Sequence, residues 1–179
     1  SVTANCDITA LREKTVRESL PFFLSLLYCA IGAANAVPEL RSRIRGEDAV
    51  EYDRCDSSHT VSLPDGSYCY CRLDCAKPFA EFLPYAQAEV ERVKAAPDID
   101  DGEDGDSLFF VSSLPWISFT GLSLPTPSPA GAAGRLIPRF FPQEGRILLP
   151  VNLTVHHALV DGLHAARFFA ELERRCAEF

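Results

Sequence analysis

The stretch His156-His157-Ala158-Leu159-Val160-Asp161-Gly162 lies between two segments of different periodicity. Before it, the apolar, branched residues from Ile147 to Val155 predict a β-strand. After it, apolar residues at helical spacing predict an amphipathic helix over Leu163 to Glu178. The stretch is therefore predicted to be an open loop where a rigid strand ends. The residues expected on the buried face of the helix are Ala165, Phe168, Phe169, Leu172, Cys176 and Phe179.

A second block accompanies the first. Residues 110–120 read Phe-Val-Ser-Ser-Leu-Pro-Trp-Ile-Ser-Phe-Thr. Together with the first block, which continues through His164 to Arg167-Phe168, this block resembles the chloramphenicol acetyltransferase family. That family carries His-His-Ala-x-x-Asp-Gly-Phe-His-x-x-Arg-Phe and Ser-x-x-Pro-Trp-x-x-Phe patterns. The resemblance covers nearly the whole chain and is strongest after Leu108.

The order of the predicted elements favours an α+β fold, a mixed α/β two-layer sandwich, because helices and strands alternate irregularly with hairpins. The length of 179 residues suits a single domain over residues 1–179. The resemblance implies the coenzyme-A-dependent acyltransferase version of this fold. It further implies a homotrimer with active sites at the subunit boundaries. It also implies that a family segment of about thirty residues precedes the position of Ser1.

Acyl transfer from a thioester to an alcohol requires removal of a proton, stabilisation of an oxyanion and correct positioning of two substrates. Histidine suits the first task, because its ordinary pKa of about 6.5 allows proton transfer near neutral pH. The resemblance assigns the general base to His157 and the oxyanion donor to Ser112. His156 is predicted to be structural, because adjacent strand residues face opposite sides. Trp116, the one tryptophan, is predicted to pack in the core.

Asp161 and Gly162 are predicted to support the site. Asp161 could orient His157 as the acid of a catalytic triad does. The resemblance implies instead that Asp161 pairs with an arginine of the preceding segment, without which a buried carboxylate would be costly. Gly162 is expected to permit a turn that a side chain would block. The family threonine that supports the oxyanion serine falls near Ile137, which has no hydroxyl.

The formal net charge of −8 is concentrated in one segment. Six acids lie between Asp98 and Asp106, and without them the charge would be −2, so the run reads as a solvated loop. The sequence has no basic stripe, so nucleic-acid binding is not expected. The longest apolar run, Leu20 to Val37, is interrupted by polar residues and proline, so no membrane span is expected. With no leader-like start, a cytoplasmic location is expected.

The seven cysteines are expected to be reduced thiols, because their number is odd and no leader is seen. The spacing of Cys69, Cys71 and Cys75 differs from that of a zinc knuckle. Cys69 and Cys71 would share one face of a strand and pack as small apolar residues. No metal site is therefore predicted.

The resemblance implies acetyl-CoA as co-substrate and a small-molecule alcohol as acceptor, although no nucleotide-binding fingerprint is present. Two alternatives are a dihydrolipoamide acyltransferase-like core and a catalytically idle trimeric relative that acts as a binding module. The missing arginine and Ile137 favour the idle relative. Acids and glycines of Pro97 to Asp106 stand where the family places a pocket phenylalanine. Chloramphenicol is therefore predicted to be a poor acceptor, since an aromatic drug binds through buried apolar area.

The local patterns predict further elements along the chain. The predicted helices are Ile8–Glu18 with Asp7 as N-cap, Phe22–Ala36 opened by Pro21, and Lys77–Ala95. The predicted strands are Ser1–Cys6, Arg41–Arg45, Ala49–Asp53, Ser58–Leu63, Ser67–Arg72, Leu108–Ser113, Ile117–Leu122 and Leu136–Phe141, with a loop over Pro125–Gly134.

Overall fold

The computed structural model describes residues 1–100, 105–122 and 134–179, and residues 134–138 by their backbone only. Its helices are α1 (Thr9–Arg17), α2 (Phe22–Asn35), α3 (Phe79–Ala95) and α4 (Gly162–Ala177), with short 3-10 helices η1 (Pro38–Arg41) and η2 (Gly105–Ser107). Its strands are β1 (Val2–Asp7), β2 (Ser42–Arg45), β3 (Asp48–Glu51), β4 (Asp56–Ser62), β5 (Tyr68–Leu73), β6 (Leu108–Leu114), β7 (Gly134–Pro138), β8 (Phe141–Gln143) and β9 (Arg146–Thr154).

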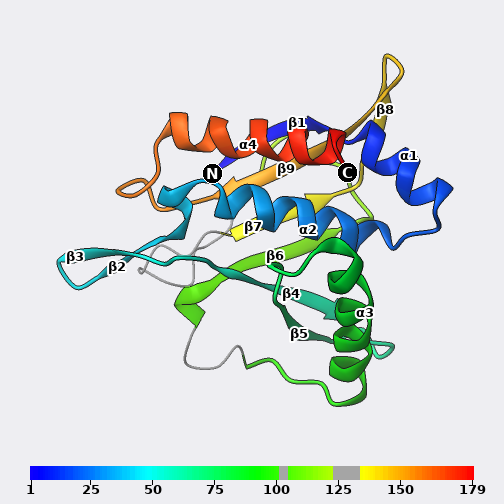
Figure 1. The fold of residues 1–179 in the computed structure, drawn as a ribbon, viewed down its shortest axis with the longest axis horizontal. Helices are drawn as coiled ribbons and strands as arrows, with labels where there is room; N and C mark the ends of the chain where they lie inside the picture. Colours follow the sequence, from blue (N-terminus) through cyan, green and yellow to red (C-terminus); the bar gives the residue numbers. More distant parts are fainter. Residues whose placement is uncertain (101–104, 123–133) are drawn as a thin grey trace.

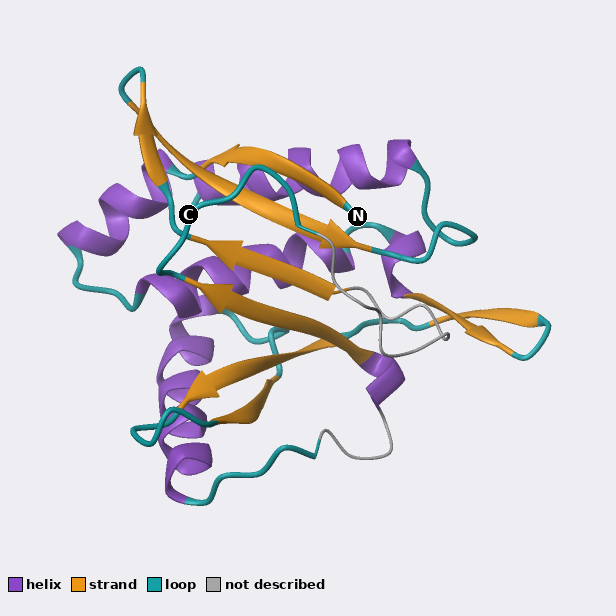
Figure 2. Ribbon diagram, turned by 180° about the vertical axis from the view of Figure 1, so that it is seen from behind, coloured by secondary structure: helices purple, strands orange, loops and turns teal. Residues whose placement is uncertain are grey.

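The main sheet has the strand order β1-β9-β7-β6-β4-β5, with β8 paired to β9. The pairs β4–β6 and β6–β7 are parallel, whereas the other pairs are antiparallel. The helices α1, α2, α3 and α4 lie on one face of this sheet (Figure 1), and none of these described α-helices covers the opposite face (Figure 2). The predicted α+β two-layer fold is confirmed.

The hydrophobic core fills the space between the helices and the sheet. Most of α2 is buried, as its nearly continuous apolar sequence predicts. In α4, Ala165, Phe168, Leu172 and Cys176 are buried, while Phe169 is half-buried against the same core. The spacing of apolar residues therefore identified the inner face of the last helix. Within the described residues, no helix has both the length and the apolar character needed to cross a membrane.

The sheet face that lacks helices is polar near its centre. His59 of β4 faces the helices, where its ring lies 5.2 Å from that of Phe23, so its neighbour Thr60 faces the other side. On that side Asn152 of β9 donates to Thr3 Oγ1 and to the carbonyl of Leu122, each at 3.0 Å. Hydroxyl and amide groups thus line the face that carries the predicted Ser112.

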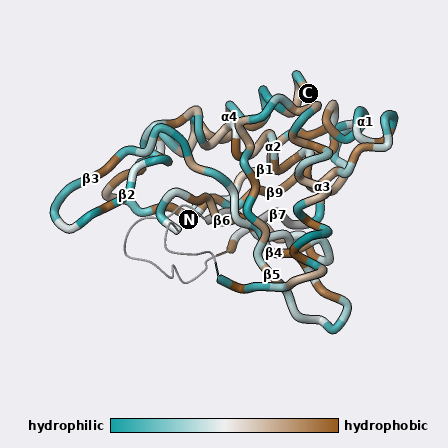
Figure 3. The backbone as a smooth tube through the Cα atoms, turned by 60° about the horizontal axis from the view of Figure 1, so that its bottom comes forward, coloured by the Kyte–Doolittle hydropathy of each residue, from teal (hydrophilic) through white to brown (hydrophobic). Residues whose placement is uncertain are grey.

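The β2–β3 hairpin extends away from the main sheet (Figure 1), and its tip is hydrophilic (Figure 3). At its base the fully buried guanidinium of Arg43 donates to the carbonyls of Leu40, Ser42 and Leu108. These bonds fasten the hairpin and η1 to the first residue of β6.

The strand predicted over Ile117–Leu122 is wrong. The chain turns at Pro115-Trp116 and then runs irregularly, with Ile117 O accepting from Arg139 N at 2.8 Å. Both edges of β6 are already occupied, by β4 and β7, so a strand continuing from it has no free partner there. The core role predicted for Trp116 is also wrong, because this residue is 70% exposed.

The start of α1 and the extent of β7 also differ from the prediction. Asp7 precedes the N-cap residue Ile8, and its carboxylate accepts from Thr9 N and Thr9 Oγ1 at 2.9 and 2.6 Å. The strand predicted over Leu136–Phe141 is divided into β7 and β8, because β7 ends at Pro138. Of the predicted Pro125–Gly134 loop, Gly134 begins β7 and residues 125–133 lie outside the described residues. Residues 101–104 of the acidic run also lie outside them.

Leu172→Ala tests the packing of α4 on the sheet. Leu172 is fully buried, so the substitution should lower the free energy of unfolding by about 2–5 kcal/mol, measured by urea denaturation. Val16→Ala is the control, because Val16 is 60% exposed and should change stability by no more than about 0.5 kcal/mol. Equal effects of the two substitutions would contradict this core.

Candidate active site

The segment between β9 and α4 is a hydrogen-bonded turn. The N–H groups of Leu159 and Val160 both donate to the carbonyl of His156, at 3.0 and 3.1 Å. Val160 is buried and anchors the turn, whereas His156 and His157 are exposed. The strand-alternation argument for His156 is wrong, because both histidines follow the end of β9. His156 instead accepts from Ala158 N through Nδ1 at 3.3 Å, a local turn-forming contact.

The orientation of His157 follows from one contact. Its Nδ1 lies 3.2 Å from the carbonyl oxygen of Val160. A carbonyl oxygen can only accept, so Nδ1 carries the proton in this contact. The lone pair of the neutral ring is therefore on Nε2. This tautomer leaves one nitrogen available to take a proton from a substrate.

Asp161 is the N-cap of α4. Its Oδ1 accepts from Leu163 N and His164 N at 2.9 and 3.2 Å. These hydrogen bonds, the one from His164 first, lower the pKa of the Asp161 carboxyl. Asp161 is exposed, so the free-energy cost expected for a buried, unpaired carboxylate does not apply. Asp161 supports the turn before α4 by capping the helix.

The reason predicted for Gly162 is not found within the chain. Gly162 is the first residue of α4, and it is absent from the positions with positive φ. Among the described residues, no atom lies within 4 Å of the place that a Cβ would take. None of these residues would therefore block a side chain at this position.

Ser112 lies in β6 on the polar face of the sheet. Its Oγ is 3.4 Å from Oγ1 of Thr60 in the neighbouring strand β4. On its other side the backbone register pairs Ser112 with Leu136 and Ser113 with Ile137, neither of which has a hydroxyl. The hydroxyl partner of Ser112 thus comes from the earlier strand and not from the later one that the resemblance indicated. Sequence reasoning missed Thr60 because parallel pairing of β4 and β6 is non-local.

The structure does not bring Ser112 and His157 together within one chain. Ser112 pairs with Leu136, which in turn pairs with Asn152 of β9. The two strands are thus separated by two spacings of about 4.8 Å, or roughly 10 Å. His157 lies still farther along, three residues past Thr154 at the end of β9. Within one chain the two candidate side chains are therefore not adjacent.

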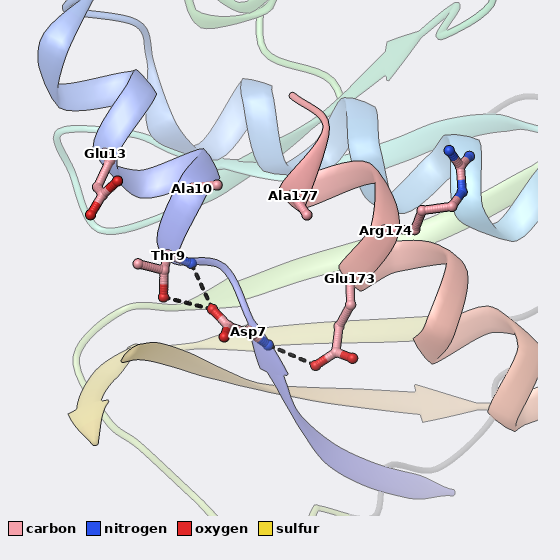
Figure 4. Close-up of a pocket in the computed structure, with 7 residues that line it drawn as sticks. All are labelled: Asp7, Thr9, Ala10, Glu13, Glu173, Arg174 and Ala177. Carbon is pink, nitrogen blue, oxygen red and sulfur yellow. Dashed lines mark hydrogen bonds between the residues drawn. The ribbon is translucent and has the colours of Figure 1, made fainter. Parts of the chain in front are cut away.

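A pocket of about 460 Å³ lies between α1 and the end of α4 (Figure 4). Within it Glu173 Oε1 accepts from Asp7 N at 2.8 Å. Glu173 lies roughly 17 Å along α4 from Gly162, the first residue of the helix. The pocket is therefore separate from the His157 turn. The lining residues are Asp7, Thr9, Ala10, Glu13, Glu173, Arg174 and Ala177.

All the cysteines are free thiols with no disulfide between them. Each of them is buried except Cys75, which is half-buried. Burial raises the pKa of Cys71 and of Cys75 to about 12, so these thiols stay protonated at neutral pH. Burial also lowers the pKa of nearby His59 to about 4. In the part of the chain that is described, no three His, Cys, Asp or Glu side chains gather as metal ligands.

Comparisons with known proteins identify the family of the chain. The profile of the family "Chloramphenicol acetyltransferase" matches residues 1–173. The chain is 33% identical to chloramphenicol acetyltransferase 2 of Escherichia coli, over 98% of this chain and 84% of that protein. It is 28% identical to a chloramphenicol acetyltransferase of Clostridium butyricum, over 100% of this chain and 84% of that protein.

Solved structures give the same result. A chloramphenicol acetyltransferase matches with a TM-score of 0.89 and 25% identity, covering 98% of this chain and 86% of the other. The cubic core of the pyruvate dehydrogenase complex matches with a TM-score of 0.75 and 21% identity, over 99% of this chain and 80% of the other. The likeness to the pyruvate dehydrogenase core shows the fold alone. The alternative of a dihydrolipoamide acyltransferase-like core is therefore weaker than the chloramphenicol acetyltransferase assignment.

The fold and these likenesses define an acyltransferase. The chain belongs to the chloramphenicol acetyltransferase family. The resemblance carried by the two sequence blocks is thereby confirmed.

Substitutions of Asp161 separate helix capping from charge pairing. Asparagine is as good an N-cap as aspartate, so Asp161→Asn should keep acyl transfer within about threefold. Asp161→Ala should lower transfer by at least about tenfold, as loss of an orienting partner does, and should lower Tm. The capping contribution of the wild type should be present at neutral pH and be lost as pH falls through the lowered carboxyl pKa. Thermal unfolding and transfer rates measure these effects. Equal losses in the two variants would instead indicate a charge partner for Asp161.

Proposed function

We propose that this protein transfers the acetyl group of acetyl-CoA to a hydroxyl group of a small molecule, with His157 as general base. The observation that carries the proposal is the 3.2 Å contact of His157 Nδ1 with Val160 O, which leaves Nε2 as an exposed proton acceptor. Family membership supplies the thioester as acyl donor. The names of the relatives include acetyl transfer, which supports this donor.

The reaction follows from these groups. His157 Nε2 takes the proton of the acceptor hydroxyl as its oxygen attacks the thioester carbonyl. The carbonyl oxygen gains negative charge, to which the Ser112 hydroxyl donates a hydrogen bond. Collapse then breaks the carbon–sulfur bond, and the leaving sulfur takes the proton from the imidazolium. The acceptor keeps the acetyl group as an ester, and neither Ser112 nor a cysteine is acylated.

The roughly 10 Å of sheet between the strands of Ser112 and His157 supports a site shared by two subunits. In the proposed homotrimer, His157 of one subunit meets Ser112 of the next across each boundary. Closed cyclic symmetry repeats this contact three times without leaving a free surface. Thr60 lies on the same face of the sheet as Ser112. The Thr60 hydroxyl can hold the Ser112 side chain in one rotamer.

The acceptor is proposed to be a small-molecule alcohol that is more polar than chloramphenicol. The weak fit of chloramphenicol stays a prediction, since it rests on the acids and glycines of Pro97 to Asp106. Steady-state kinetics with acetyl-CoA, chloramphenicol and a panel of more polar alcohols test it. Saturation by chloramphenicol at micromolar concentration with rapid turnover would reject this prediction while supporting the reaction class.

His157→Ala tests the proposed base. The variant should fold normally and lose about 10²–10⁴-fold in acetyl transfer, measured as release of the coenzyme A thiol. His156→Asn is the matched control, because asparagine can still accept from Ala158 N in the same turn. The control should retain activity within about threefold. Wild-type turnover by His157→Ala would remove His157 from the mechanism.

Subunit mixing tests the shared site. Ser112→Ala should by itself lose about 10²–10³-fold. When Ser112→Ala and His157→Ala chains are co-expressed in equal amounts, about a quarter of the sites in randomly assembled cyclic trimers combine an intact Ser112 with an intact His157. Activity should therefore return to about a quarter of the wild-type value, although each variant alone is nearly inactive. Absence of recovery in mixed trimers, verified by mass spectrometry, would show that the two residues do not share a boundary site.

A further inference from the structure

One peptide group joins two imidazole rings at the start of α4. The carbonyl of the Val160–Asp161 peptide faces Nδ1 of His157 at 3.2 Å. The N–H of the same peptide donates to Nδ1 of His164, also at 3.2 Å. His157 and His164 therefore contact opposite ends of a single rigid peptide unit.

The chain of contacts continues from His164 to Glu39. Because His164 Nδ1 accepts the Asp161 N–H, the proton of the neutral ring is on Nε2. Nε2 lies 3.3 Å from Oε1 of Glu39 in η1 and can donate to it. This tautomer satisfies the Asp161 N–H and Glu39, while Nδ1 also lies 3.2 Å from Oδ1 of Asp161. The second oxygen of Glu39 is buried and finds no partner in the described part of the chain.

Glu39 is firmly placed. Its neighbour Leu40 is buried in the core, and the Leu40 carbonyl accepts from the buried Arg43. Arg41 pairs with Glu51 at 2.9 Å, which leaves the Glu39 carboxylate to His164. The carboxylate is therefore held by an element that is distant in sequence from the His157 turn.

We propose that Glu39 and His164 are positioning residues for His157, acting through the Val160–Asp161 peptide. This inference rests on the proposed role of His157 as general base. The Glu39 carboxylate polarises His164, which in turn polarises the peptide and strengthens its carbonyl as an acceptor. The stronger carbonyl holds His157 in the Nδ1–H tautomer and favours the imidazolium that forms during proton transfer. An exposed histidine in a turn thereby gains a fixed orientation.

Histidine 15N NMR on the full chain tests the tautomer directly, and it does so whatever the acceptor is. Wild-type His157 should carry its proton on Nδ1, and His164 on Nε2. In His164→Ala, His157 should become a mixture of the two neutral tautomers. In the same variant kcat should fall by about tenfold, a part of the roughly 10²–10⁴-fold supplied by a general base. The KM for acetyl-CoA should stay within about twofold.

Matched variants separate positioning from general stability. His164→Gln should restore much of kcat, because glutamine is an ordinary capping-box partner at this helix position and accepts the Asp161 N–H. Glu39→Gln should lower kcat in the same direction as His164→Ala. Glu51→Gln is the control, because it breaks an ion pair to the same η1 helix without touching His164. It should leave kcat and the His157 tautomer unchanged.

A folded His164→Ala protein with wild-type kcat and a single Nδ1–H tautomer of His157 would overturn the inference. Equal losses of kcat in Glu51→Gln and Glu39→Gln would also overturn it. Failure of the proposed function has a different result, in which His157→Ala keeps its activity while the NMR signals still report the hydrogen-bond chain.

Discussion

The backbone register across β9, β7 and β6 determines where the candidate catalytic groups lie. The antiparallel pairing of β9 with β7 sends the end of β9 toward the beginning of β6, beside which β7 runs in parallel. Ser112 is therefore inside the sheet, while His157 is beyond its edge. The two side chains are thus separated within one chain by the strands of the sheet itself. The assembly of subunits is thus part of the proposed chemistry and not an addition to it.

The second constraint is the hydrogen bonding around Val160 and Asp161. His157 is exposed, so packing alone does not fix its ring. The Val160 carbonyl fixes the tautomer of His157, and the Asp161 cap fixes the N-terminus of α4. The buried face of α4 then holds the helix on the sheet. A local turn acquires its rigidity from long-range packing in this way.

Much of the fold was predictable because its signals are local. The apolar spacing of α4, the continuous apolar sequence of α2 and the turn residues of the β4–β5 hairpin each report nearby structure. The strand predicted over Ile117–Leu122 failed because strand formation depends on a free partner. His164 was recognised only as part of a motif, although its position three residues after Asp161 matches a capping box. The proposed roles of Thr60 and Glu39 rest on contacts between distant segments, which no local pattern reports.

The most direct test of this account is a crystal structure of the assembled protein with coenzyme A and an acceptor alcohol. The account predicts that the thiol of coenzyme A and the acceptor hydroxyl converge on Nε2 of His157, within about 3–3.5 Å. It also predicts that the Ser112 hydroxyl of the neighbouring subunit faces the position of the acyl oxygen. Coenzyme A bound away from His157, or a complete site within one chain, would contradict it.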